Sequence, residues 1–327
     1  DIFVVKYSSD CSNGYMPLIW TKQIGTNADD FAYIGEIQND VIYIMGHTDG
    51  LWGAGSTAGG TVVVKMDTEG NTLNVSQLGD QTTFNSMIVA SNGDYYVSGY
   101  IQFSGGMSDG DQEFLDGQEC TTRSGNSNNS KCQFIRKYDS SHVRQWTKVY
   151  QIDDSVFSSI RLNSDETQLI TAGVTGSDFN SQTKPAGYSS NADHVIVNSI
   201  STTNGSINWT KFTGYQTNLG NIAGHKPISY SSVKGDDALM VDGSDNIFIA
   251  HGRYSSTSGS WLTNNGGNYS RQYSQVTKLD SSGTEVWSRV FGGTEAMVGS
   301  STINEWLTSI YVTEGSQLYL TGYSAGQ

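Results

Sequence analysis

The same pattern of short segments returns five times along this chain of 327 residues. Each copy has a β-rich segment that ends in glycine, a variable stretch, a segment that usually ends in lysine, and one that usually carries tryptophan. The glycine-ending segments are VIYIMG, YYVSG, LITAG, IFIAHG and LYLTG, which end at Gly46, Gly99, Gly173, Gly252 and Gly322. Tandem repeats of this size built from short strands are typical of β-propellers and related arrays. The repeat therefore predicts an all-β fold.

Two further positions recur in the units. The lysine position is filled by Lys6, Lys65, Lys137 and Lys278, with Ser199 in the remaining unit. The tryptophan position is filled by Trp20, Trp146, Trp209 and Trp287, and we assign Val75 to it in the first unit. A residue that recurs in every unit belongs to the repeat, whereas a catalytic residue is usually unique. We therefore interpret the tryptophans as packing between blades and the lysines as outward or inter-blade ion-pair partners.

Each unit contains four strand signals, which are runs of β-branched and aromatic residues bounded by turn residues. In the first unit they cover residues 31–37, 41–48, 61–67 and 72–78. The last unit has only two, 307–313 and 317–324, and the two that it lacks match residues 2–7 and 18–24. We therefore expect one domain over residues 1–327. It would be a five-bladed β-propeller with four-stranded blades, its ring closed by N-terminal strands that complete the last blade.

The connections between strands are unequal. Most turns that join the first to the second strand, or the third to the fourth, are tight and rich in Asp, Asn and Gly. The connections from the second to the third strand are long, at residues 48–60, 104–131, 177–193 and 255–274. One face of the ring would then be plain and the other elaborated, and long loops on a rigid scaffold are where binding function usually lies.

Composition excludes some classes of protein. Only 15% of the residues are charged, the formal net charge is −14 and the sequence pI is about 4.6. With no basic stripe to neutralise phosphates, we expect no nucleic acid as a partner. No run of 18 apolar residues occurs, so we expect no membrane span. The acidity fits either colloidal solubility or binding of divalent cations, and we favour the former.

Several segments resemble a known repeat family. The runs DIFVVKY, SQVTKLDSSGTEVWSRVFGG and YVTEGSQLYLTGYS are similar to the bacterial and archaeal β-propeller repeat called SBBP. The resemblance covers all five units and implies a secreted or surface-displayed propeller, without implying any chemistry. The run TTNGSINW is similar to the tryptophan-docking motif of quinoproteins. That likeness implies a joint between neighbouring blades and no quinone cofactor.

The three cysteines suggest an oxidising compartment. Cys120 and Cys132 bracket a loop rich in Gly, Ser and Asn, where a disulfide would remove much chain freedom. We predict that bond, with two free thiols as the alternative. The third, Cys11, lies in the 8–17 loop, where it would either reach a neighbouring subunit or be buried. Together with the resemblance, this predicts an extracellular or cell-surface location.

Two kinds of modification or ligand site are suggested by local motifs. Five sequons could carry N-linked sugar in a glycosylating secretory route, at Asn74, Asn128, Asn204, Asn208 and Asn268. An alternating acidic run could bind Ca²⁺, with ligands Asp109, Asp111, Glu113 and Asp116. However, Phe114 and Cys120 stand where an EF-hand loop needs Gly and Glu. We favour a solvated acidic loop over a calcium site, and we expect no other cofactor.

The sequence contains no recognisable catalytic cluster. The first strands of the units carry one clear acid, Glu36, where a glycosidase would need paired carboxylates. The histidines share no metal-ligand spacing, and no G-x-S-x-G elbow occurs. We therefore expect no enzyme, with a glycosidase as the least favoured reading.

Two non-catalytic classes remain. We favour a structural module that associates with itself into a filament or surface layer through residues 8–17 and 104–131, because face-to-face contacts of unlike surfaces do not close on themselves. The alternative is a glycan-binding lectin that uses aromatic loop residues, namely Trp52, Tyr188, Trp261 and Tyr269.

Overall fold

The computed structural model describes residues 1–10, 14–52, 59–78, 82–103, 130–150, 156–175, 178–183, 193–217, 238–255, 271–291, 304–313 and 317–325. These residues form strands β1 to β20 and no helix, which confirms the all-β prediction. Within the same residues there is accordingly no helix long and apolar enough to cross a membrane.

Most strands belong to four antiparallel units of four strands, here called blades one to four. Blade one contains β3 (Asp30–Gln38), β4 (Val41–Thr48), β5 (Gly60–Asp67) and β6 (Thr72–Gln77). Blade two contains β7 (Thr82–Val89), β8 (Tyr95–Phe103), β9 (Ser130–Tyr138) and β10 (Arg144–Tyr150). Blade three contains β11 (Val156–Leu162), β12 (Gln168–Thr175), β13 (Asp193–Ser201) and β14 (Ile207–Thr217). Blade four contains β15 (Leu239–Val241), β16 (Ile247–Ser255), β17 (Arg271–Leu279) and β18 (Glu285–Phe291).

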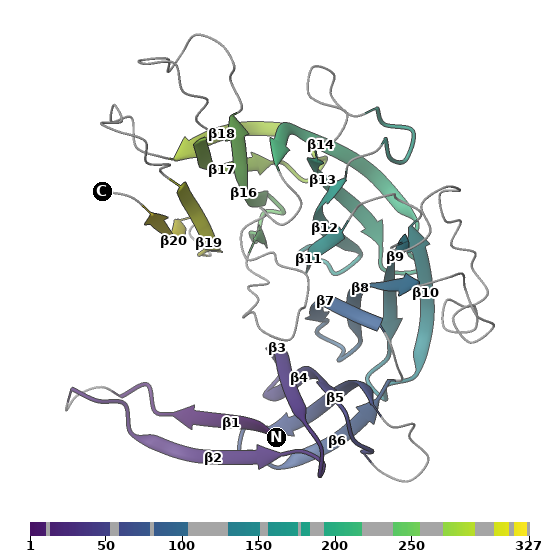
Figure 1. Ribbon diagram of the computed structural model, residues 1–327, viewed down its shortest axis with the longest axis vertical. Helices are drawn as coiled ribbons and strands as arrows, with labels where there is room; N and C mark the ends of the chain where they lie inside the picture. Colours follow the sequence, from purple (N-terminus) through teal and green to yellow (C-terminus); the bar gives the residue numbers. More distant parts are fainter. Residues whose placement is uncertain are drawn as a thin grey trace.

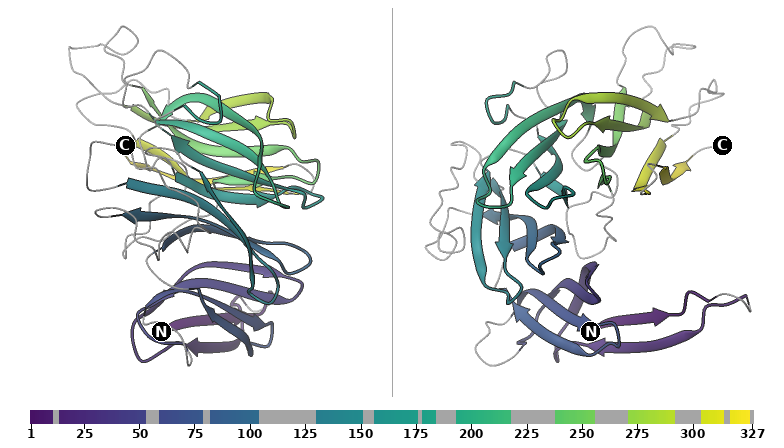
Figure 2. Two further views of the ribbon diagram at one scale, coloured as in Figure 1. Left: turned by 90° about the vertical axis from the view of Figure 1, so that its right-hand side faces the viewer. Right: turned by 180° about the vertical axis from the view of Figure 1, so that it is seen from behind.

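The blades follow one another along an open arc, as Figure 1 shows. Figure 2 shows the same sheets from the side and from behind. Successive antiparallel sheets placed in this way are the blades of a β-propeller architecture. Within each blade, neighbouring strands in the sequence are neighbours in the sheet, so the chain runs up and down before it enters the next blade.

The two ends of the described chain form separate hairpins. Strands β1 (Ile2–Tyr7) and β2 (Leu18–Ile24) make a two-stranded sheet, here called the N-terminal half-blade. Strands β19 (Asn304–Val312) and β20 (Leu318–Ala325) make the C-terminal half-blade, which is joined to blade four by one parallel bridge, Gln272 to Asn304.

The expected closure of the ring is not found in the structure. The half-blades lie at opposite ends of the arc, and no described residue of β1 or β2 pairs with β19 or β20 (Figure 1). The prediction of a closed five-bladed ring is therefore corrected to four complete blades and two half-blades. The physical reason is that the N-terminal half-blade packs on blade one and the C-terminal half-blade on blade four, which lie at opposite ends of the arc.

The inner strands of each blade are buried on both faces, because each face packs on a neighbour. In β5, Val62, Val63, Val64 and Met66 are all fully buried, so the run reads as continuous hydrophobicity with no alternation. The outermost β6 is exposed or half-buried along its length. The interior of the molecule therefore lies between blades, where each apolar cluster combines residues from successive blades.

An aspartate organises most turns between the third and fourth strands. In blade one the carboxylate of Asp67 accepts hydrogen bonds from the backbone N–H groups of Glu69 and Asn71. Asp139 and Asp280 do the same in their own turns. Such Asx turns bring the backbone around tightly, and they place the turn of one blade against the strands of the blade before it.

Candidate assembly interface

A lysine on the third strand and an aromatic ring on the second strand lie directly opposite each other in three of the four blades. The pairs, with the distance from ammonium to ring centroid, are Tyr43–Lys65 at 5.0 Å, Tyr96–Lys137 at 5.5 Å and Phe248–Lys278 at 5.1 Å. In blade three both members change together, since Ile170 lies opposite Ser199. The recurring lysine is thus half of a cross-strand cation–π pair, a contact that the sequence analysis missed.

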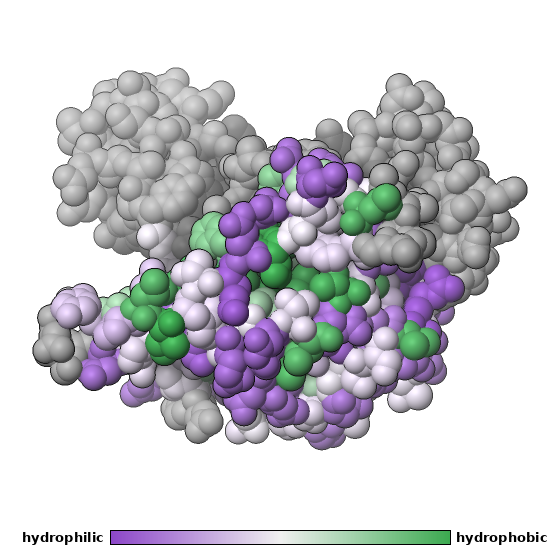
Figure 3. Space-filling view, turned by 90° about the horizontal axis from the view of Figure 1, so that it is seen from below, coloured by the Kyte–Doolittle hydropathy of each residue, from purple (hydrophilic) through white to green (hydrophobic). Residues whose placement is uncertain are grey.

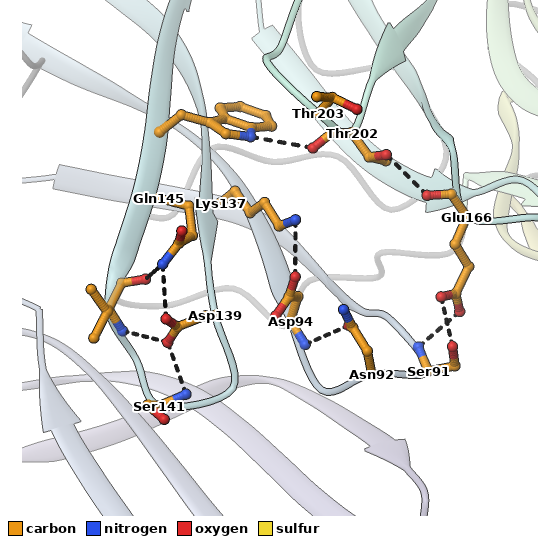
Figure 4. Close-up of polar contacts among 12 residues, drawn as sticks. Ser91, Asn92, Asp94, Lys137, Asp139, Ser141, Gln145, Glu166, Thr202 and Thr203 are labelled. Atoms are coloured by element: carbon orange, nitrogen blue, oxygen red, sulfur yellow. Dashed lines mark hydrogen bonds and ion pairs between the residues drawn. The ribbon is translucent and has the colours of Figure 1, made fainter.

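Some of these lysines also reach a backbone or acidic partner. Lys6 donates to the carbonyl of Thr68 at 2.7 Å, and Lys65 donates to that of Ser140. Both carbonyls lie in the turn of the following blade, so these two lysines act between blades. Lys137 instead pairs with Asp94 of its own blade at 2.9 Å (Figure 4).

The tryptophans lie on the turn of the following blade. The indole N–H of Trp20 donates to the carbonyl of Thr68 at 3.1 Å, and that of Trp146 donates to Thr202 at 3.2 Å (Figure 4). A turn glycine with positive φ lies beneath Trp20, Trp146 and Trp209, where a side chain would meet the ring. A Cβ on Gly205 would lie 3.0 Å from Trp146, and one on Gly283 would lie 2.8 Å from Trp209. We call this contact between consecutive blades a seam.

The turns between the first and second strands are linked in series. The backbone N–H and hydroxyl of Ser91 donate to the two carboxylate oxygens of Glu166 at 2.8 and 2.7 Å (Figure 4). Ser164 and Asp245 repeat the contact between blades three and four, at 2.7 and 3.1 Å. The amide of Asn39 donates to the carbonyl of Ser91 between blades one and two. The plain face therefore holds consecutive blades together at two sets of turns.

Replacing Gly205 by Ala tests the seam. The φ of +72° disfavours Ala, and its Cβ would also lie 2.8 Å from the Cβ of Lys148. Gly14 is a matched control, since its φ is +78° and a Cβ there would meet nothing within 4 Å. We expect Gly205→Ala to lower the free energy of unfolding in urea by about 1–3 kcal/mol more than Gly14→Ala. Equal losses would show that the seam does not depend on this glycine.

The seam between blades one and two differs from the others. Asn74, and not Val75, lies opposite Lys65, at the same nine-residue spacing that separates Lys137 from Trp146. The assignment of Val75 to the tryptophan position was therefore wrong by one residue. On the receiving side, His142 has a φ of 65° in the turn position that glycine fills elsewhere. Its Nδ1 lies 2.8 Å from the hydroxyl of Tyr95.

The imidazole of His142 is held in its neutral form. Burial lowers its pKa to about 4, the charge of Lys65 acts in the same direction, and the nearby Asp139 opposes them. Burial also raises the pKa of Tyr95, so its hydroxyl keeps its proton. This seam therefore combines a neutral histidine, a tyrosine and a cation in place of an indole.

Acid should weaken this seam. The unfolded chain protonates His142 near its ordinary pKa of 6.5, whereas the folded chain does so only near 4. Unfolding therefore takes up a proton in this range, and stability that is present above about pH 6.5 is lost as the pH falls toward 4. We expect His142→Asn, which tolerates the same φ, to show a smaller loss of thermal stability between pH 7 and pH 4. Identical pH profiles would rule out His142 as the source.

The two positions of the repeat's cation–π pair are occupied on different half-blades. Lys6 lies on β1, in the lysine position of the repeat. Tyr319 is the second paired residue of β20, as Tyr96 is of β8 and Phe248 is of β16. The side chain of Tyr319 is 56% exposed. Among the described residues β1 pairs only with β2, and β20 only with β19, so the other edge of each of these two strands is open.

Apolar side chains lie exposed on both half-blades. In the N-terminal half-blade, Ile2 packs in a cluster with residues of blade one, whereas Phe3 points the other way and is 74% exposed. In the C-terminal half-blade, Ile310 and Val312 are buried toward blade four, while Tyr311 is 58% exposed. Figure 3 views the molecule from the N-terminal end of the arc, where apolar side chains appear in green at the surface. Open edges with apolar faces are the usual signature of a strand-pairing surface.

Many of the residues singled out from the sequence lie outside the described residues, namely Cys11, Asp109, Asp111, Glu113, Asp116, Cys120, Asn128, Tyr188, Trp261, Asn268 and Tyr269. Cys132 lies in β9, and its bond to Cys120 stays a prediction. Asn74, Asn204 and Asn208 are exposed. Trp52, considered for sugar binding, is half-buried against the cluster that contains Ile2. The described residues bring together no group of three or more potential metal ligands.

Comparisons with known proteins give no identity. No protein-family model matches the chain, and no curated protein matches it, so the SBBP resemblance stays a prediction. Among solved structures, Kuenenia stuttgartiensis hydrazine synthase is 10% identical over 91% of this chain and 75% of its own, with a TM-score of 0.39. Quinohemoprotein alcohol dehydrogenase from Comamonas testosteroni is 11% identical over 93% of this chain and 52% of its own, with a TM-score of 0.40.

A third similar structure is described as the Dos1 propeller. It is 11% identical over 86% of this chain and 73% of its own, with a TM-score of 0.33. The chain spans about half the length of the Comamonas enzyme. At these scores the likenesses carry no argument about activity or cofactor.

Proposed function

We propose that this chain is a non-catalytic structural module of the cell exterior that assembles with copies of itself. Assembly would complete the split blade, with the N-terminal half-blade of one copy pairing with the C-terminal half-blade of the next. The observation that carries the proposal is the separation of Lys6 from Tyr319, the two members of a pair that lie opposite each other in three other blades.

The repeat fixes the register of such pairing. Placing Lys6 opposite Tyr319, as Lys65 lies opposite Tyr43, puts Val4 opposite Thr321 in an antiparallel ladder. The open edges of β1 and β20 would then satisfy each other's backbone groups, as in strand addition to a sheet edge. The result is a fifth four-stranded blade with the same strand order as the others.

The position of the half-blades favours a second copy over closure within one chain. Trp20 and Lys6 hold the N-terminal half-blade on blade one, and the C-terminal half-blade is held on blade four at the far end of the arc (Figure 1). Pairing between copies needs no change in the arc, whereas closure within one chain requires the arc to bend. A head-to-tail contact of this kind produces an open filament unless the rotation between copies closes it into a ring.

Completion of the blade also supplies a driving force. Phe3, Tyr311 and Tyr319 are each more than half exposed, and a completed blade would cover them. Burying a large apolar side chain that was exposed contributes about 1.5–3 kcal/mol. Three such side chains together with a strand ladder are sufficient to offset the entropy lost on association at moderate protein concentration.

Disulfide trapping tests the pairing and its partner. Val4 and Thr321 would face each other across the new ladder at a separation that suits a disulfide. After oxidation, we expect a mixture of Val4→Cys and Thr321→Cys chains to give a cross-linked dimer. Each variant alone serves as the control for the native cysteines. A double variant that cross-links only within single chains would overturn self-assembly and leave a closed ring, and no cross-link at all would overturn blade completion.

Substitution of Tyr319 tests the proposed cation–π contact with Lys6. We expect Tyr319→Leu to weaken self-association by about three- to thirtyfold, because the cation–π pair with Lys6 is lost. Tyr319→Phe keeps the ring and should associate like the native chain. Sedimentation over a range of concentrations measures the difference. Leu and Phe variants that associate equally would remove the pair from the interface.

A further inference from the structure

We propose that Asn74 carries an N-linked sugar, and that this sugar covers the seam between blades one and two as an indole covers the other seams. The inference is independent of self-assembly, because it concerns the outer strand of blade one. It rests on the register of β6, on the turn of blade two and on the exposure of the Asn74 side chain.

Asn74 occupies the docking position of the repeat. In every other unit the residue opposite the lysine position is a tryptophan, and the pairs are Lys6–Trp20, Lys137–Trp146, Ser199–Trp209 and Lys278–Trp287. In blade one the residue opposite Lys65 is Asn74. This asparagine begins the sequon Asn74-Val75-Ser76. The one docking position without an indole is therefore also an acceptor site for sugar.

The turn of blade two that meets this position also differs from the corresponding turns of the other blades. The carbonyl of Thr68 accepts hydrogen bonds from both the ammonium of Lys6 and the indole of Trp20. The corresponding carbonyl of Ser140 accepts a hydrogen bond from the ammonium of Lys65, and Asn74 has no indole N–H that could donate a second one. The glycine that makes room for an indole elsewhere is replaced by His142. The seam is thus no longer shaped for a flat aromatic ring, while the side chain of Asn74 is exposed.

The environment of Asn74 suits modification better than that of a second sequon. Asn74 is exposed on β6, which pairs only with β5 and forms the outer edge of blade one. In contrast, the amide of Asn208 donates to the hydroxyl of Ser199 at 3.1 Å. The hydroxyl of the Asn208 sequon belongs to Thr210, which is buried and donates to Asn198 at 2.7 Å. Asn208 is therefore a matched internal control.

The attachment is a glycosyl transfer catalysed by a separate transferase. A bond forms between Nδ2 of Asn74 and C1 of the first sugar. The bond between C1 and the diphosphate oxygen of a polyprenyl-diphosphate-linked donor breaks, and the amide loses one proton. The product keeps an amide N–H, and its pyranose ring has about the footprint of the six-membered ring of an indole, so it can lie over the turn of blade two.

Peptide mass spectrometry of the protein from its native source tests the site. We expect the peptide that contains Asn74 to carry a saccharide mass, which is lost in Asn74→Gln and in Ser76→Ala, while the Asn208 peptide is unmodified. An unmodified Asn74 peptide would overturn the proposal. So would modification at Asn208 and not at Asn74.

A stability measurement tests the covering role. Enzymatic removal of the sugar should lower the melting temperature by about 1–2 °C, equivalent to roughly 1 kcal/mol for a chain of this size. The double variant Asn74→Trp with His142→Gly rebuilds the ordinary seam, and it should reach the melting temperature of the glycosylated protein without sugar. A melting temperature unchanged by removal of the sugar would refute the covering role.

Discussion

The structure depends on the way one blade is fastened to the next. Trp20 and Lys6 of the N-terminal half-blade both reach one turn of blade one, which is shaped by Asp67 and Gly70. Lys65 and Trp146 make one of these two contacts each at the next two joints. Because no blade encloses a core of its own, its apolar faces are excluded from water only while it stays packed on the neighbouring blades. The contact also has a direction, since Trp20, Trp146 and Trp209 each pack on a turn of the blade that follows in the sequence.

The repeat allowed the strands to be located from the sequence, because lysine, glycine and tryptophan recur at fixed places. It did not predict that Tyr43 and Phe248 would lie opposite the lysines, although aromatic residues near the start of β4, β8 and β16 carried that signal. Asn74 was missed although the spacing carried the signal, because Trp146 and Trp287 follow the lysines of their units by nine residues, as Asn74 follows Lys65. Ring closure was wrong because matching strand patterns do not determine which copy of a strand is the partner.

The same direction of fastening explains why the two ends of the arc are complementary. The N-terminal half-blade holds blade one through an indole on a turn, as blade two holds blade three, so it behaves as the outer half of a preceding blade. The C-terminal half-blade behaves as the inner half of a blade, with Ile310 and Val312 buried toward blade four. One end therefore carries the outer half of a blade and the other end carries the inner half, and the strand order of the repeat defines how two copies would pair.

The seams are joined in series but they are not equal. The seams between blades two and three and between blades three and four have an indole on a glycine. The seam between blades one and two has Asn74 and His142 in these two positions. In a chain of links under tension, extension concentrates at the weakest link. A filament built from this module would therefore yield at one defined joint in every subunit, and the other blades would stay folded while that joint absorbs the load.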